Sequence, residues 1–327
     1  MRLCPVVSRY LRRVIEELVL RLEAGDDSVV DELADLAAAD PILVAPYALR
    51  LVDAGVAWRA DVLYRAGDEH FQRELVGRID GGAAGRPALL VYLLAQAPGP
   101  ETEAAFRRWM TAPPPGIDPY GRGIAALVRD GGWELSQGSG RRALCGTSAY
   151  RLDSVVSTSA AKGVCPWCRS FLWTALDLQT SESAVAKALA HTGWQGKLRI
   201  DICAYCVCYG PVYVNVTADG GSSWSKHTVR PGYLPDDHPE TPPQARFTPG
   251  ARRPTEHLAS AWEAGGSTLG GFPDWIQDPA YPLCLQCHQA MDYVGLINGS
   301  DLWDGEGAYY LFLHAPCGLA AADYQQS

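Results

Sequence analysis

The spacing of apolar residues divides the chain into a helical first part and a β-rich second part. Between residues 10 and 22, apolar side chains recur every three or four positions, which places them on one face of a helix. They are Tyr10, Leu11, Val14, Ile15, Leu18, Val19 and Leu22. Gly25 to Asp27 end this helix, and Ser28 is placed to cap a second one over 29–39. Pro41 opens a third helical segment that is predicted to run through Val52.

Further short helices, rich in Ala and Leu and bounded by Gly, Pro or Asp, are predicted at about 59–65, 69–79, 88–96, 101–111 and 119–129. Short helices in series are typical of a HEAT-like repeat or of a helical bundle, and the absence of a fixed period leaves both open. We therefore predict a helical interaction module over residues 1–130.

The pattern changes from Trp133 onward, where aromatic and β-branched residues cluster in short runs. Such runs predict strands at 198–202, 212–216 and 309–313, and the sequence at 218–221 is typical of a hairpin turn. A single helix is predicted at 183–191, and the proline-rich stretch 231–254 is predicted to be a long surface loop. Together the two patterns predict an α+β protein with a β-rich domain over residues 131–327.

Charge and hydropathy narrow the functional classes. The net charge of −9 argues against non-specific binding to nucleic acid, which requires cations that face phosphates. No run of roughly 18 apolar residues is present, so no transmembrane helix is expected. Charged residues from Arg9 to Glu17 interrupt any signal-peptide core. A cytoplasmic protein that binds neither membrane nor nucleic acid is expected.

Ten cysteines then become informative, because six of them form Cys-x-x-Cys pairs, and in a cytoplasmic chain this favours metal over disulfides. One candidate site, site B, consists of Cys284, Cys287, His314 and Cys317, with 26 residues between the two pairs. That separation suits a hairpin that brings the pairs together. His288, next to the first pair, is an alternative to His314.

A second candidate, site A, consists of Cys165, Cys168, Cys203 and Cys206, with 34 residues between the pairs. Cys208 is an alternative to Cys206, since both would lie on the same side of an extended segment. A redox function of the Cys165-Pro-Trp-Cys168 motif is also open, but that motif should follow a strand and open a helix. No strand is predicted before it.

The two sites share one plan. In each, a Cys-x-x-Cys pair precedes a strand that ends in a second pair of ligands, which indicates an internal duplication with each copy pinned by one ion. Four soft or borderline ligands close a tetrahedral zinc, so two structural Zn²⁺ ions are predicted. Cys4 and Cys145 receive no role.

A catalytic alternative rests on carboxylates near two tryptophans, Trp275 and Trp303. The carboxylates are Asp274, Asp301, Asp304 and Glu306. A carboxylate pair flanked by aromatic rings is typical of a glycosidase cleft, so a hydrolase is the second hypothesis. Such Asp and Gly residues also make turns between strands, and no phosphate loop, Gly-x-Ser-x-Gly or His-Glu-x-x-His motif is present. The protein is therefore expected not to be an enzyme.

The run from Leu269 to Gln277, Leu-Gly-Gly-Phe-Pro-Asp-Trp-Ile-Gln, resembles the signature of the YwqG-like family of domains of unknown function. The strand 293–297, the turn 302–307 and the strand 309–313 are similar to the pieces that follow it there, although Leu296 stands where the family often has Gln. The cysteine pairs also resemble those of the more distant programmed cell death protein 2 family. The resemblance implies a duplicated β-rich fold and a protein-binding role of adaptor, chaperone-like or immunity type.

Overall fold

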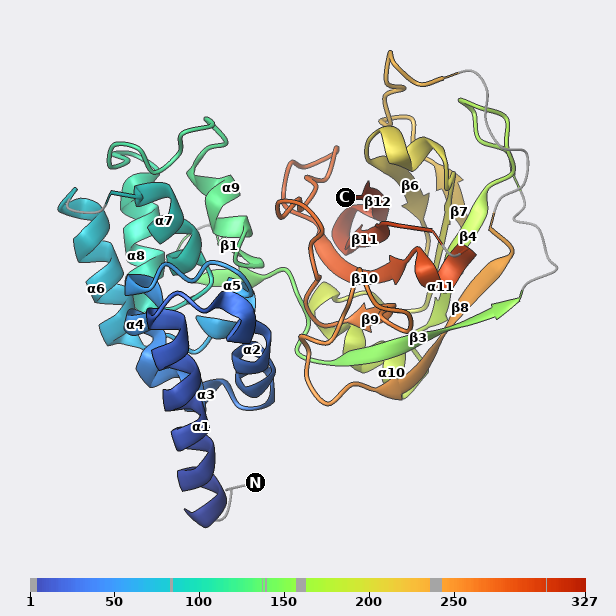
Figure 1. The fold of residues 1–327 in the computed structure, drawn as a ribbon. Coiled ribbons are helices and arrows are strands. Elements are labelled where there is room, and N and C mark those ends of the chain that lie inside the picture. Colours follow the sequence, from blue (N-terminus) through green and yellow to red (C-terminus); the bar gives the residue numbers. More distant parts are fainter. Residues whose placement is uncertain are drawn as a thin grey trace. The chain divides into compact units, whose positions relative to one another are not determined.

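The chain forms two compact units, Met1–Arg142 and Ala143–Ser327. The computed structural model describes residues 5–82, 85–136, 138, 140–156, 163–235, 243–303 and 305–327. The first unit is helical, and the second is built on one ten-stranded sheet (Figure 1). The predicted order, a helical module followed by a β-rich domain with two cysteine-rich groups, is confirmed.

The helical unit packs short helices around one apolar core. Its largest fully buried side chains are Tyr64, Phe106, Trp109 and Trp133. The helices are α1 (Pro5–Glu23), α2 (Val30–Ala39), α3 (Pro41–Val44), α4 (Ala48–Asp53), α5 (Ala60–Leu63), α6 (Glu69–Asp80), α7 (Pro87–Ala95), α8 (Pro100–Trp109) and α9 (Ile124–Arg129). Apart from α1, with 19 residues, these helices are too short to be stable alone in water, so the shared core holds them in place. None of the described helices is both long and apolar enough to cross a lipid bilayer.

Three details of the helical predictions were wrong. Asp26, and not Ser28, caps the turn before α2, because its carboxylate accepts a hydrogen bond from the Ser28 amide. The third segment is interrupted by a 3₁₀ turn at Ala45–Tyr47, where Pro46 cannot donate a helical hydrogen bond. The last helix starts at Ile124 and not at 119, because Gly121 and Gly123 have positive φ angles.

A small sheet of β1 (Trp133–Leu135) and β2 (Arg141–Ala143) follows α9. The buried Trp133 indole donates a hydrogen bond to the Ala95 carbonyl at 2.8 Å, so β1 packs with the helices. The compact helical unit thus extends to Arg142, past the predicted limit at residue 130.

The large sheet curls into a nearly closed, barrel-like ring. Its strand order is β5-β4-β8-β3-β9-β10-β11-β12-β6-β7. The strands are β3 (Ala149–Val156), β4 (Trp173–Gln179), β5 (Lys197–Ile202), β6 (Val212–Val216), β7 (Ser222–Trp224), β8 (Ala245–Arg252), β9 (Thr268–Gly270), β10 (Asp292–Asn298), β11 (Ala308–His314) and β12 (Leu319–Gln325). At the two ends of the series, the Lys197 amide donates to the Ala218 carbonyl at 2.8 Å, and the Asp201 amide donates to Ser222 Oγ at 3.0 Å. These bonds join β5 to the β6–β7 hairpin.

The prediction of a continuous loop over 231–254 was wrong in its second half. Residues 245–252 form β8, which pairs with β3 along its length and touches β4 at Leu176 and Phe247. Phe247 is fully buried, and Pro249 lies at the register shift of the β3–β8 pairing, where a proline is tolerated.

The sheet contains the predicted duplication. β4, helix α10 (Ser183–Ala188) and β5 form one antiparallel hairpin, and β10, helix α11 (Ser300–Trp303) and β11 form the other. Both hairpins have a register shift near the start of the first strand, between Thr174 and Leu176 and between Tyr293 and Gly295. The copies meet where β3 pairs antiparallel with β9 and where β12 pairs antiparallel with β6. The repeat is not exact, because β8 lies between β3 and β4, whereas β9 pairs directly with β10. This arrangement is an approximate two-fold repeat.

The outer faces of the two hairpins differ. On the second hairpin, Tyr310 stacks on Trp275 with ring centroids 4.6 Å apart, and Phe312 lies beneath Tyr281. On the first hairpin the corresponding face is polar, since Asp201 accepts hydrogen bonds from Thr174 and Arg199. One copy thus has an aromatic cover, and the other has a charged network.

Candidate metal centres

The first Cys-x-x-Cys pair of each site lies in a tight turn of the same kind, which we call knuckle A (164–171) in site A and knuckle B (283–290) in site B. In knuckle A, the Arg169 amide donates to the Cys165 carbonyl at 3.0 Å, and the Cys165 amide donates to the Ser170 carbonyl at 2.8 Å. Arg169 follows the second cysteine and has a φ of 67°. This left-handed residue reverses the chain, so that Val164 pairs with Phe171 and both cysteines lie on the inside of the turn.

Knuckle B repeats these contacts at equivalent positions. The His288 amide donates to the Cys284 carbonyl at 2.8 Å, the Cys284 amide donates to the Gln289 carbonyl at 2.8 Å, and Leu283 pairs with Ala290. His288 has a φ of 61° and so occupies the same place as Arg169. His288 thus shapes the turn through its backbone amide and φ angle, and not through its imidazole.

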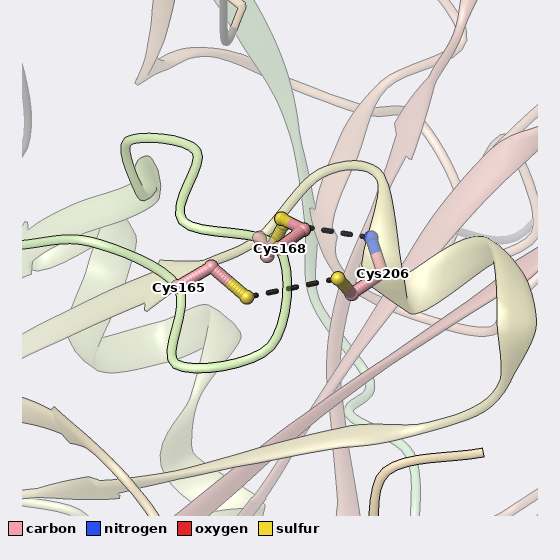
Figure 2. A group of neighbouring side chains, drawn as sticks. Cys165, Cys168 and Cys206 are labelled. Atoms are coloured by element: carbon pink, nitrogen blue, oxygen red, sulfur yellow. Dashed lines mark hydrogen bonds between the residues drawn. The ribbon is translucent and has the colours of Figure 1, made fainter. Parts of the chain in front are cut away.

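Site A gathers the four predicted cysteines. Cys203 directly follows β5, and Cys206 begins the 3₁₀ turn Cys206–Tyr209 before β6. The Sγ atoms of Cys165 and Cys206 lie 3.6 Å apart, and those of Cys168 and Cys203 lie 3.5 Å apart. Figure 2 shows the Cys165 and Cys206 sulfur atoms facing each other. All four ligand atoms lie within 4.8 Å of one another, and three of the residues are buried.

Cys208, the alternative to Cys206, points elsewhere. Its Sγ donates to the Ala204 carbonyl at 3.5 Å, and it does not belong to the group of four. The 3₁₀ turn accounts for this difference, because an extended segment would have placed Cys206 and Cys208 on one side.

Crowding of the sulfur atoms couples the protonation of site A. Hydrogen bonds from Cys203 and Cys206 lower the pKa of the Cys165 thiol, while the same contacts raise the pKa of Cys203 and of Cys206. One negative charge in the cluster therefore opposes further ones. Four thiolates so close together require a cation between them.

Site B gathers Cys284 and Cys287 from knuckle B with His314 and Cys317 at the β11–β12 connection. The Cys287 Sγ lies 3.8 Å from His314 Nδ1 and 3.6 Å from Nε2. Burial, followed by hydrogen bonds with Cys284 and Cys287, raises the pKa of Cys317 to about 12. His288, the alternative to His314, is exposed and outside the group of four.

A further residue completes the surroundings of site B. The side-chain oxygen of Gln289 lies 3.3 Å from His314 Nε2. If Nε2 donates to it, Nδ1 is left as the metal ligand, and such a partner fixes both the tautomer and the ring plane. Sequence reasoning missed Gln289, although its place two residues after Cys287 closes the knuckle.

The dimensions of both groups fit zinc. With Zn–S bonds of about 2.3 Å, a tetrahedron has edges of about 3.8 Å between sulfur atoms. The observed sulfur–sulfur and sulfur–nitrogen separations of 3.5 to 3.8 Å come close to this edge. The structure thus brings the eight predicted ligands together as a Cys4 group and a Cys3His group, consistent with two metal sites. Zinc as the metal stays a prediction.

Two carboxylates of the hydrolase hypothesis bind loop amides, and the exposed Glu306 accepts a hydrogen bond from the Ser327 hydroxyl at 3.4 Å. Asp301 accepts hydrogen bonds from the Gly265 and Ser267 amides, and Asp274 accepts one from the Ala261 amide. The side chain of Trp303 and the whole of Asp304 lie outside the described residues, as does Cys4. The buried Cys145 Sγ lies 3.0 Å from the hydroxyl of Tyr281, within the apolar cover of the second hairpin.

Comparison with known proteins gives one distant relative. The chain is 28% identical over 236 residues to the uncharacterized protein YpfL of Salmonella typhimurium (strain LT2), and the match covers 68% of this chain and 55% of that protein. The chain thus spans about half the length of that relative. No family model and no solved structure matches the chain. The resemblance to YwqG-like domains stays a prediction.

Proposed function

We propose that this chain is a non-enzymatic, cytoplasmic protein-binding protein whose β unit is held together by two structural zinc ions. The observation that carries the proposal is that each metal group consists of four protein ligands within 4.8 Å of one another. A zinc ion with four protein ligands has no open position for water or substrate, so it supports the fold and not a reaction.

The surroundings of the sites favour this role over the two alternatives. Asp274 and Asp301, two of the carboxylates in the hydrolase hypothesis, hold loop amides. The redox hypothesis expects a helix directly after Cys-x-x-Cys, whereas Cys168 is followed by a left-handed residue and then by β4. Cys165, the residue that would attack, is fully buried.

The partner is proposed to be another protein. The resemblance to the YwqG-like and programmed cell death protein 2 families, with their adaptor, chaperone-like or immunity-type roles, supports this. The distant relative adds no activity, because its name states none.

Native mass spectrometry of the full chain, purified gently from its own host, tests the proposal. We expect the mass of two zinc ions and a co-purifying protein chain. A chain that carries disulfides and no metal would contradict the structural zinc and favour the redox hypothesis. The Cys317→Ser variant tests site B in the same way: it should lose that ion and misfold, and a soluble variant without the ion but with an unchanged melting temperature would contradict a structural role.

A further inference from the structure

A cleft of about 500 Å³ lies beside knuckle B on the β unit. Its walls come from β6, β7, the segment after β7 and the tip of the knuckle. The lining residues are Asn215, Trp224, Lys226, His227, Leu285 and Gln286. The volume falls in the range of small-molecule and side-chain pockets.

The polar part of the cleft favours an anion. Asn215, Lys226 and His227 offer side-chain donors, and no carboxylate of the described residues, which omit 236–242, lines the cleft. The Lys226 ammonium is exposed and forms no ion pair with a carboxylate of the described residues. The chain has a net charge of −9, so a cleft whose described lining offers a lysine and no carboxylate departs locally from the overall charge.

The apolar part of the cleft is held rigidly. The half-buried Trp224 ring meets the Trp167 ring edge to face, with centroids 5.0 Å apart, and Trp167 belongs to knuckle A. Knuckle A therefore supports Trp224 through Trp167. Leu285 and Gln286, at the tip of knuckle B, also line the cleft. A fixed aromatic ring offers contact area with little loss of side-chain entropy.

We propose that this cleft binds an acidic segment of a partner protein. A glutamate or aspartate carboxylate of the segment pairs with Lys226, and a neighbouring apolar side chain packs on Trp224. The proposal rests on the protein-binding function given above and assigns it to a surface. Because knuckle B forms one wall, an ion at site B would hold the cleft in its binding shape.

The test is a selection of random dodecapeptides by phage display on the immobilised, zinc-loaded full chain. The enriched peptides are then synthesised with a fluorescent label, and their affinities are measured by anisotropy. Lys226→Glu should weaken binding by about tenfold or more, and Lys226→Arg should retain it, because the charge is kept. Lys187→Glu is the matched control, since Lys187 is exposed on α10 and undergoes the same change of charge.

The expected result is enrichment of peptides with Asp or Glu beside an apolar residue, with the loss confined to Lys226→Glu. Peptides that bind the wild type and Lys226→Glu equally would contradict the cleft as the binding site but leave a protein-binding function in place. Enrichment of non-acidic peptides, or of none, would also overturn it. Zinc content and thermal unfolding of each variant show that the fold is intact.

Discussion

At the scale of single residues, the occurrence of glycine at both 270 and 271 has a steric explanation. Gly270 and Gly271 have φ angles of 71° and 70°. A Cβ atom would lie 2.4 Å from the Ser148 carbonyl oxygen at Gly270 and 2.4 Å from the Glu256 carbonyl oxygen at Gly271. Both the backbone angle and the lack of space require glycine here.

Gly270→Ala should therefore lower the free energy of unfolding by more than the ~1 kcal/mol expected for a left-handed alanine alone, and we expect about 3 kcal/mol. Gly265→Ala is the control, because Gly265 has a φ of 80° and no neighbouring atom within 4 Å of the added Cβ. Urea unfolding of both variants measures the difference. Equal losses would show that the carbonyl of Ser148 moves aside.

Gln289 provides a second residue-scale prediction. Gln289→Ala removes the partner of His314 Nε2 and should reduce the zinc affinity of site B by 10- to 100-fold, while site A is unaffected. Competition with a chromophoric chelator measures both sites. Gln286→Ala, at the exposed tip of the same knuckle, should leave the affinity of site B unchanged, and equal effects of the two variants would exclude the assigned role.

At the scale of elements, the two knuckles share their backbone contacts but differ in exposure. In site A, Cys168 alone is half-buried and the other three cysteines are buried, whereas in site B Cys287 is exposed and Cys317 is half-buried. Metal-bound thiolates that are open to solvent react faster with mercurial reagents. The equivalent turns should therefore release their ions at different rates.

We expect a limited amount of an organomercurial to release one zinc per chain first, and that zinc from site B. Release is followed with a colorimetric zinc indicator, and mass spectrometry after alkylation identifies the reacted cysteines. Cys287 and Cys317 should be modified before Cys168. Simultaneous loss of both ions would show that the sites are coupled, against this expectation.

The sequence predicted the elements that carry their own local signal. Helix periodicity located α1, α6 and α8, and the ligand spacing located both metal groups. Strand β8 was missed because its Pro249 and Gly250 are typical of a loop, and only its neighbours β3 and β4 make it a strand. The choice between Cys206 and Cys208 depended on a 3₁₀ turn that alternation of residues cannot reveal. The cleft at Trp224 depends on tertiary contacts between distant segments.

At the scale of the whole molecule, each unit has its own buried core, and both metal groups lie in the β unit. A structural zinc contributes on the order of 10 kcal/mol to the folding of a small domain. Loss of metal should thus unfold the β unit and spare the helical one.

A strong chelator is expected to abolish near-ultraviolet circular dichroism from the aromatic cover of β10 and β11 while most of the helical signal at far-ultraviolet wavelengths persists. Limited proteolysis should then leave a stable fragment that ends near Arg142. Cooperative loss of both signals at one chelator concentration would contradict independent units.

Site A also lies where the ring of strands closes. Cys203 directly follows β5, and Cys206 precedes β6. The segment that carries these two ligands therefore connects the two ends of the sheet. Few hydrogen bonds between the ends support this closure, among them the Lys197–Ala218 and Asp201–Ser222 contacts. A sheet that opens there would expose unpaired edges able to recruit strands from other molecules. Metal supply would then decide more than stability: a chain starved of its ion would be prone to aggregate, and its abundance in the cell would follow the zinc available during synthesis.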